Sequence, residues 1–166
     1  NYPGTSFNLY KKYTYSEVCW LLNWKAEEVS LNIGGYKFDT YSKTYPVFIN
    51  YEKGDDVGAT TRYEDRFNDQ TTLTAISKSR RTLDSEDVIN ARNSKSRGIL
   101  MPLFVRKNKD DQTSKEFYFL GTMEHNGIAS EFIMPGTEGI TAVEIGYKLN
   151  TPGENNLDEY LTEQSL

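Results

Sequence analysis

The stretches GILMPLFVRK, residues 98–107, and EFYFLGTM, residues 116–123, are the best strand candidates in the chain. Both are rich in aromatic and aliphatic residues, which favour a pleated and half-buried surface. The polar segment NKDDQTSK between them has the composition of a loop. We therefore predict two neighbouring strands joined as a hairpin-like pair.

Further strands are predicted on both sides of this pair. YPVFINY, residues 45–51, and ITAVEIGYKL, residues 140–149, have the β-branched and aromatic content of strands. NIGGYKF reads as a tight turn that leads into a strand, whereas RYEDRFND is ambiguous between a strand end and a turn. MEHNGIA, which contains His125, reads as a turn.

Two helices are predicted with definite start signals. Thr14 and Glu17 have the spacing of a capping box, and an apolar stripe at helical spacing follows and ends near Asn23. TLDSEDVINAR combines possible caps with an acidic first turn, which predicts a helix over residues 85–92. The polar NNLDEYLTE can form a short third helix.

These elements predict an α+β domain with about five to seven strands and two or three short helices. Because the strands must pair with partners distant in sequence, the sheet closes as a strongly bent sheet or a small β-barrel. A chain of 166 residues is long enough for one core, so we expect a single domain over residues 1–166. The first residue is Asn1 rather than Met, so we expect a piece of a larger protein.

Composition limits both location and chemistry. No apolar run approaches the roughly 18 to 20 residues of a membrane span, so we expect no membrane partner. The chain has one cysteine, Cys19, and therefore no intramolecular disulfide, which favours a cytoplasmic location.

Catalytic chemistry is poorly supported by the residue types present. One cysteine and one histidine, His125, cannot build a zinc site of four Cys/His ligands. Cys19 sits in an apolar helical pattern that favours a core role. Glu144 and Lys148 lie on one strand face as in some nucleases, but no partner aspartate is evident. We expect no catalytic residue, no metal and no cofactor.

The net charge of −5 hides a segregation of sign along the chain. The window from Ile76 to Lys109 has nine cations and three anions, whereas the remainder has ten cations and 21 anions. Arginine outnumbers lysine only inside this window, and arginine is suited to a bidentate grip on phosphate or guanine edges. A basic insert in an acidic chain is typical of a phosphate-binding face, although the charges could also be spread over unrelated solvated faces. The candidate DNA-binding residues are Lys78, Ser79, Arg80, Arg81, Arg92, Lys95 and Arg97.

Several aromatic residues of the first third flank predicted turns or lie beside carboxylates. Such an arrangement can stack an extruded cytosine while the acid accepts a hydrogen bond from its exocyclic amine. The same residues can also pack in the core, with the acids pairing with Arg62 and Arg66. The candidate base-pocket residues are Trp24, Tyr36, Tyr63, Glu64 and Asp65.

A series of ordered motifs between Leu9 and Pro152 resembles a known family. LYKKYTYSEVCWLLNW, GGYKF, PVFINYEK, TRYEDRF, SKSRRT, GILMPLFVRK and EFYFLG are together similar to a C-terminal domain of unknown function found on superfamily II helicases that also carry a phospholipase-D-type nuclease domain. The SKSRR segment departs from relatives that carry neutral polar residues at this place. Among these proteins the chain most resembles the target-recognition domain of ATP-dependent type IV restriction enzymes.

This resemblance implies an SRA- or PUA-like fold and a recognition role. It implies binding to double-stranded DNA that contains 5-methylcytosine or 5-hydroxymethylcytosine, by base flipping. The implied partners within the same polypeptide are nuclease and helicase domains, and the motifs of those domains are absent from this chain. The alternative is a protein-docking module that couples or regulates a helicase motor without reading DNA.

Overall fold

The computed structural model describes residues 2–24, 38–52, 65–108 and 116–150. Within these residues there are seven strands and three helices, all of them short except for one strand. In chain order they are β1 (Lys12–Thr14), α1 (Tyr15–Leu21), β2 (Val47–Glu52), β3 (Arg66–Phe67), β4 (Thr72–Ile76), α2 (Glu86–Arg92), α3 (Ser94–Arg97), β5 (Pro102–Asn108), β6 (Glu116–Ile133) and β7 (Thr141–Leu149).

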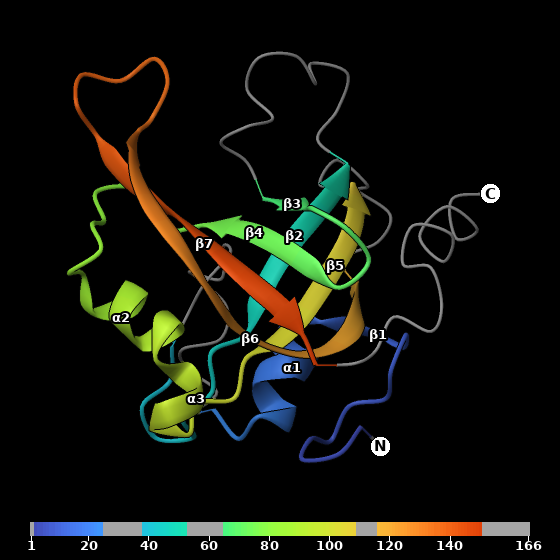
Figure 1. Cartoon of the computed structure of the whole chain (residues 1–166). Coiled ribbons are helices and arrows are strands. Elements are labelled where there is room, and N and C mark those ends of the chain that lie inside the picture. The colour runs from blue at the N-terminus through green and yellow to red at the C-terminus, as the bar shows by residue number, and fades with distance from the viewer. Residues whose placement is uncertain (1, 25–37, 53–64, 109–115, 151–166) are drawn as a thin grey trace.

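The strands form one curled mixed sheet in the order β2-β5-β6-β7-β4-β3, with β1 paired to the start of β6. β2 runs parallel to β5, and the pairs β5–β6, β6–β7, β7–β4 and β4–β3 are antiparallel. In Figure 1 β4 and β7 cross in front of β2 and β5, which shows how far the sheet bends over. The prediction of a strongly bent sheet with a few short helices is confirmed, as is the pairing of β5 with β6.

β6 is the longest element, at 18 residues, and it belongs to both halves of the sheet. Its first part pairs with β1 and β5, and its part from Met123 to Ile133 pairs with β7. The register shifts between His125 and Ala129, where Gly127 has a φ of +94°. The prediction of a turn at MEHNGIA is therefore wrong, because a bulge with a glycine at positive φ absorbs the turn-forming residues and the strand continues.

Side-chain alternation along the central strands builds two hydrophobic cores. In β2, Val47 and Ile49 pack into one cluster, while Phe48 points to the other face and packs into the second cluster. β5 repeats the pattern with Leu103 and Phe104. Because successive side chains of a strand point to opposite faces, this part of the sheet is covered on both sides.

α1 covers the aromatic face of the sheet. Its N-terminus has the predicted capping box, since Thr14 Oγ1 accepts from Glu17 N at 3.2 Å and Glu17 Oε1 accepts from Thr14 N at 3.0 Å. Val18 and Cys19 are fully buried against the aromatic cluster. The thiol of Cys19, which is in no disulfide, thus occupies a core position, as the apolar pattern predicts.

α2 lies on the other side, against the aliphatic cluster. It begins after Ser85 as predicted, and Val88 and Ala91 are its buried residues in that cluster. The loop that leads from β4 into α2 carries three of the nine cations of the sequence window, namely Lys78, Arg80 and Arg81. None of the helices in the described part of the chain is long and apolar enough to cross a membrane.

Candidate nucleic-acid interface

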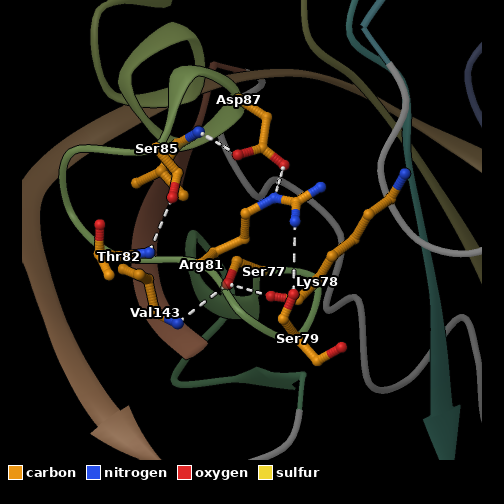
Figure 2. A network of polar contacts seen from close by, with 9 residues as sticks. Ser77, Lys78, Ser79, Arg81, Thr82, Ser85, Asp87 and Val143 are labelled. Atoms are coloured by element: carbon orange, nitrogen blue, oxygen red, sulfur yellow. Dashed lines mark hydrogen bonds and ion pairs between the residues drawn. The ribbon is translucent and has the colours of Figure 1, made fainter. Parts of the chain in front are cut away.

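The segment of residues 77–85, between β4 and α2, is named the cationic loop. It runs along β7 and is held there by backbone hydrogen bonds. Ser77 N donates to Val143 O at 2.9 Å, and Arg80 N donates to Thr141 O at 2.7 Å. Val143 N in turn donates to Ser77 Oγ at 2.9 Å, which Figure 2 shows among the contacts of the loop. The loop therefore continues the sheet for a few residues beyond β4.

Further contacts fix the second half of the cationic loop. Leu83 N donates to Glu131 Oε1 on β6 at 2.7 Å. Thr82 N donates to Ser85 Oγ at 2.8 Å (Figure 2). Ser85 N donates to Thr82 O at 3.1 Å. These bonds join the loop to the β6–β7 hairpin and to the start of α2.

Arg80 has an unusual backbone conformation within this loop. Its φ is +65°, in the left-handed region that residues with a Cβ seldom adopt. The bond from its backbone N to Thr141 O holds it there. The Arg80 side chain is exposed as a result.

Arg81 makes a charge-assisted contact with α2. Its Nε donates to Asp87 Oδ2 at 2.8 Å, and its Nη1 lies 3.4 Å from Ser79 O. The other carboxylate oxygen of Asp87 accepts from Val88 N at 2.9 Å. Figure 2 shows the guanidinium between the carboxylate and the Ser79 carbonyl. The orientation of Arg81 is therefore fixed before any ligand binds.

An open cavity of about 580 Å³ lies between the cationic loop, α2 and the segment that precedes β2. This volume is in the range of ligand sites in proteins. The cavity combines cations, acids, an amide and two aromatic rings. Its lining residues are Phe38, Tyr45, Lys78, Arg80, Arg81, Ser85, Glu86, Asp87 and Asn90.

The aromatic part of the cavity is formed by Phe38 and Tyr45, whose ring centroids lie 5.8 Å apart. Tyr45 is 2% exposed. Burial raises the pKa of the Tyr45 hydroxyl far above its usual range, the neighbouring Tyr147 and the Asp87 charge raise it further, and Arg81 opposes the shift. The hydroxyl therefore stays protonated at neutral pH.

The predicted DNA-binding residues fall into two groups. Lys78, Arg80 and Arg81 line the cavity, and Ser79 lies between them on the same loop. Arg97 reaches this group indirectly, because its Nη1 donates at 2.8 Å to the Oδ1 atom of Asn90, a lining residue.

Arg92 and Lys95 face β6 instead of the cavity. Lys95 Nζ lies 3.5 Å from Glu124 Oε2. The positive charge of Arg92 is close enough to His125 to lower its pKa, although desolvation is the larger cause. The structure therefore brings together only part of the basic window.

Of the predicted base-pocket residues, the two that the structure describes, Trp24 and Asp65, do not line this cavity. Trp24 is 6% exposed in the aromatic core, and its Nε1 donates to Thr44 Oγ1 at 2.6 Å. The Asp65 carboxylate accepts from Ile76 N at 2.7 Å, at the end of β4. Tyr36, Tyr63 and Glu64 lie outside the described residues. Trp24 thus has a core position rather than a place in an open pocket.

Six lining residues of the cavity were not assigned to a site by sequence reasoning, namely Phe38, Tyr45, Ser85, Glu86, Asp87 and Asn90. Tyr45 was expected in a strand, and Asp87 in the acidic first turn of a helix, where carboxylates are common for electrostatic reasons alone. One sequence signal could have predicted a site role for Asp87. Arg80 and Arg81 precede it by seven and six residues, and a basic loop that leads into an acidic first turn can bring an arginine and a carboxylate together.

The curled mixed sheet with a few peripheral helices defines an SRA-like fold, and comparison with solved structures supports this class. A structure described as KRYPTONITE in complex with mCHG DNA and SAH matches with a TM-score of 0.51 and 13% identity, over 91% of this chain and 33% of that chain. The DNA modification-dependent restriction endonuclease AspBHI matches with a TM-score of 0.52 and 11% identity, over 87% of this chain and 43% of that chain. This chain thus spans less than half the length of either protein.

The sequence also matches a known protein family. The chain belongs to the family described as Domain of unknown function (DUF3427), which matches residues 7–161. No curated protein matches the chain.

Proposed function

We propose that this domain is a target-recognition module that binds duplex DNA containing 5-methylcytosine or 5-hydroxymethylcytosine, with the modified base flipped into the cavity beside α2. The observation that carries the proposal is that Lys78, Arg80 and Arg81 line the same cavity as Phe38 and Tyr45. Cations suit the phosphate backbone, and aromatic faces suit an unstacked base.

The energetics assign different roles to the two parts of the cavity. Burying one methyl group contributes only about 0.8 kcal/mol, whereas flipping a base costs a few kcal/mol. Contacts with phosphate must therefore supply most of the affinity. Lys78 and Arg80, both exposed on the cationic loop, are placed to make them.

Asp87 provides a polar group that can recognise a cytosine. Each carboxylate oxygen can accept two hydrogen bonds, so Asp87 can accept from the exocyclic amine while it keeps its bond to Arg81. Phe38 adds an apolar face, against which the C5 substituent can pack.

Two further observations support this proposal. The structures that share the fold include one described with mCHG DNA and one described as a DNA modification-dependent restriction endonuclease. The sequence resemblance to type IV restriction enzymes points the same way. On this basis we propose that the domain reads DNA in the cytoplasm for nuclease and helicase domains of the same polypeptide, and does not itself catalyse cleavage.

A second candidate function is protein docking, because the described surface exposes several large apolar side chains. Trp20 is 75% and Tyr41 80% exposed. Ile128 and Ile133 on β6 are 70% and 62% exposed. Contiguous apolar patches mark interaction surfaces, whereas single exposed residues are ordinary.

Binding of this domain to matched duplexes decides between the two functions. The duplexes carry cytosine, 5-methylcytosine or 5-hydroxymethylcytosine at one position and are compared at two salt concentrations. The proposal expects binding that weakens with salt and is tighter for a modified duplex. Equal affinity for all three duplexes would exclude modification reading, and no binding at low salt would favour docking.

A further inference from the structure

We infer that Glu131, an exposed acid on β6, is a positioning residue that holds the cationic loop in the geometry needed for DNA. This inference rests on the proposed function. Glu131 Oε1 accepts a hydrogen bond from Leu83 N at 2.7 Å, across 48 positions of sequence. It thereby attaches the loop to the β6–β7 hairpin through a side chain.

The bond between Leu83 N and Glu131 matters because of its position in the second half of the cationic loop. The two contacts with β7, at Ser77 and Arg80, are made before Arg81. After Arg81, Thr82 bonds to Ser85 and Asp84 within the loop, and Ser85 O accepts from Ile89 N of α2, so none of these bonds reaches the sheet. Among the hydrogen bonds of the described residues, the Leu83 bond is therefore the one that ties this second half to the sheet.

The side chain of Leu83 also packs partly against the aliphatic core. Loss of the Glu131 bond should therefore loosen the loop without unfolding the domain. Arg81 and the exposed Arg80 would then sample more orientations. In the variant, DNA binding would then have to order these two side chains at a cost in conformational entropy. In the unsubstituted domain this entropy is already lost when the loop folds.

Charge and position make opposite predictions for this residue. A carboxylate beside a DNA-binding loop repels phosphate, so electrostatics alone predicts that its removal strengthens binding. A positioning role predicts that its removal weakens binding. The sign of the change in affinity therefore distinguishes the two effects.

Three substitutions separate the charge from the hydrogen bond. Glu131→Ala removes both, and Glu131→Gln removes the charge but keeps an acceptor oxygen at the same reach. Glu131→Asp keeps the charge on a side chain that is one methylene shorter. Glu138→Ala is the matched control, since Glu138 is an exposed acid near the tip of the same hairpin and makes no hydrogen bond with the described residues.

The readouts are the dissociation constant for a 5-methylcytosine duplex and the hydrogen-exchange rate of the Leu83 amide. Loss of a hydrogen bond to a charged group is expected to weaken binding by about three- to tenfold in Glu131→Ala and Glu131→Asp. Glu131→Gln should bind within about twofold of the unsubstituted domain because its amide oxygen still accepts. Glu138→Ala should bind as tightly or slightly more tightly. The Leu83 amide should exchange faster in the Ala and Asp variants alone.

Two results would overturn the inference. One is binding by Glu131→Ala that equals or exceeds that of the unsubstituted domain, and the other is an unchanged exchange rate at Leu83. If the unsubstituted domain bound no duplex at all, the proposed function would fail, and the exchange rate would still decide whether Glu131 holds the loop.

Discussion

Arg81 Nε and Asp87 Oδ2 meet at 2.8 Å, which joins the cationic loop to the first turn of α2 at the wall of the cavity. Both side chains are about one-third exposed, so solvent screening limits what the pair adds to the stability of the fold. Its main consequence is geometric, because one carboxylate both orients an arginine and faces the space where a base would sit.

Replacement of Asp87 by alanine should reduce the discrimination of cytosine from thymine. The variant loses the proposed acceptor for the cytosine amine, and a good base contact contributes about 1–3 kcal/mol of discrimination. The preference for a 5-methylcytosine duplex over a duplex with thymine at the same position should therefore fall by about tenfold, because thymine has a carbonyl oxygen where cytosine has the amine. The preference over unmodified cytosine should stay unchanged, since both cytosines carry this amine. Competition binding measures both quantities. Asp84→Ala, an equal change of charge at an exposed loop position outside the cavity, should keep the preference.

Lys78→Ala should weaken binding to every duplex by a similar factor. Lys78 lines the cavity and is exposed, so we expect it to contact phosphate rather than a base. Loss of one phosphate contact should lower the slope of log affinity against log salt by about 1. Titrations at several salt concentrations test this. Lys11→Ala, at an exposed lysine beside β1, should leave the slope unchanged, and an equal effect of both substitutions would refute a specific contact at Lys78.

Arg80 should respond to substitution according to its backbone conformation. At a φ of +65° a β-branched residue is strained, so Arg80→Val should lower the free energy of unfolding by about 1–2 kcal/mol. Arg80→Gly adopts this φ without a Cβ penalty and should stay within about 1 kcal/mol of the unsubstituted domain. Both variants should lose DNA affinity. Urea denaturation measures the stability, and equal stability of the two variants would contradict the prediction.

Stability should depend on pH through His125, the only histidine of the chain. Desolvation and then the charge of Arg92 lower its pKa, against a bond between Nδ1 and Gly146 O at 2.8 Å that raises it. Because the folded pKa lies below the unfolded value of about 6.5, the unfolded chain binds more protons in this range. The free energy of unfolding should therefore fall as the pH drops below about 6.5, until the folded pKa is passed. Denaturation between pH 7 and 5 tests this, and His125→Gln should remove the corresponding part of the pH dependence.

Gly146 on β7 should not accept a side chain while Asn126 is present. A Cβ at Gly146 would overlap the amide of Asn126, whose Oδ1 accepts from Ile128 N within the β6 bulge. Gly146→Ala should lower the free energy of unfolding by about 1–3 kcal/mol, as is typical of overpacking. The double variant with Asn126→Ala should recover part of this loss, and a double-mutant cycle measures the coupling. If the changes in the free energy of unfolding of the two single variants simply added, the Cβ at position 146 would not be in conflict with the Asn126 side chain.

The sequence predicted those elements whose signals are local. The capping box of Thr14 and Glu17 located α1, and the acidic first turn located α2. The extension of β6 to Ile133 was missed, because Asn126 and Gly127 are turn formers in isolation and the bulge depends on pairing with β7. Tertiary pairing thus overrode the local preference.

The candidate site was predictable only in part, for a related reason. The arginine pair stood out by composition and does line the cavity. Phe38 and Tyr45 lie about forty residues earlier, and they meet the cationic loop only because the sheet curls. Neither periodicity nor charge along the chain carries that information, so their place in the cavity could not be read before the fold was known.

β6 also has a mechanical consequence. The same strand pairs with β5 beside the aromatic core and with β7 beside the cationic loop. Truncation of Phe117, which lies in the aromatic core on β6, is therefore expected to destabilise the cationic loop as well. The two halves of the sheet should open and close together, and if the loop binds DNA as proposed, damage in the aromatic core would reduce the fraction of molecules able to bind at any instant.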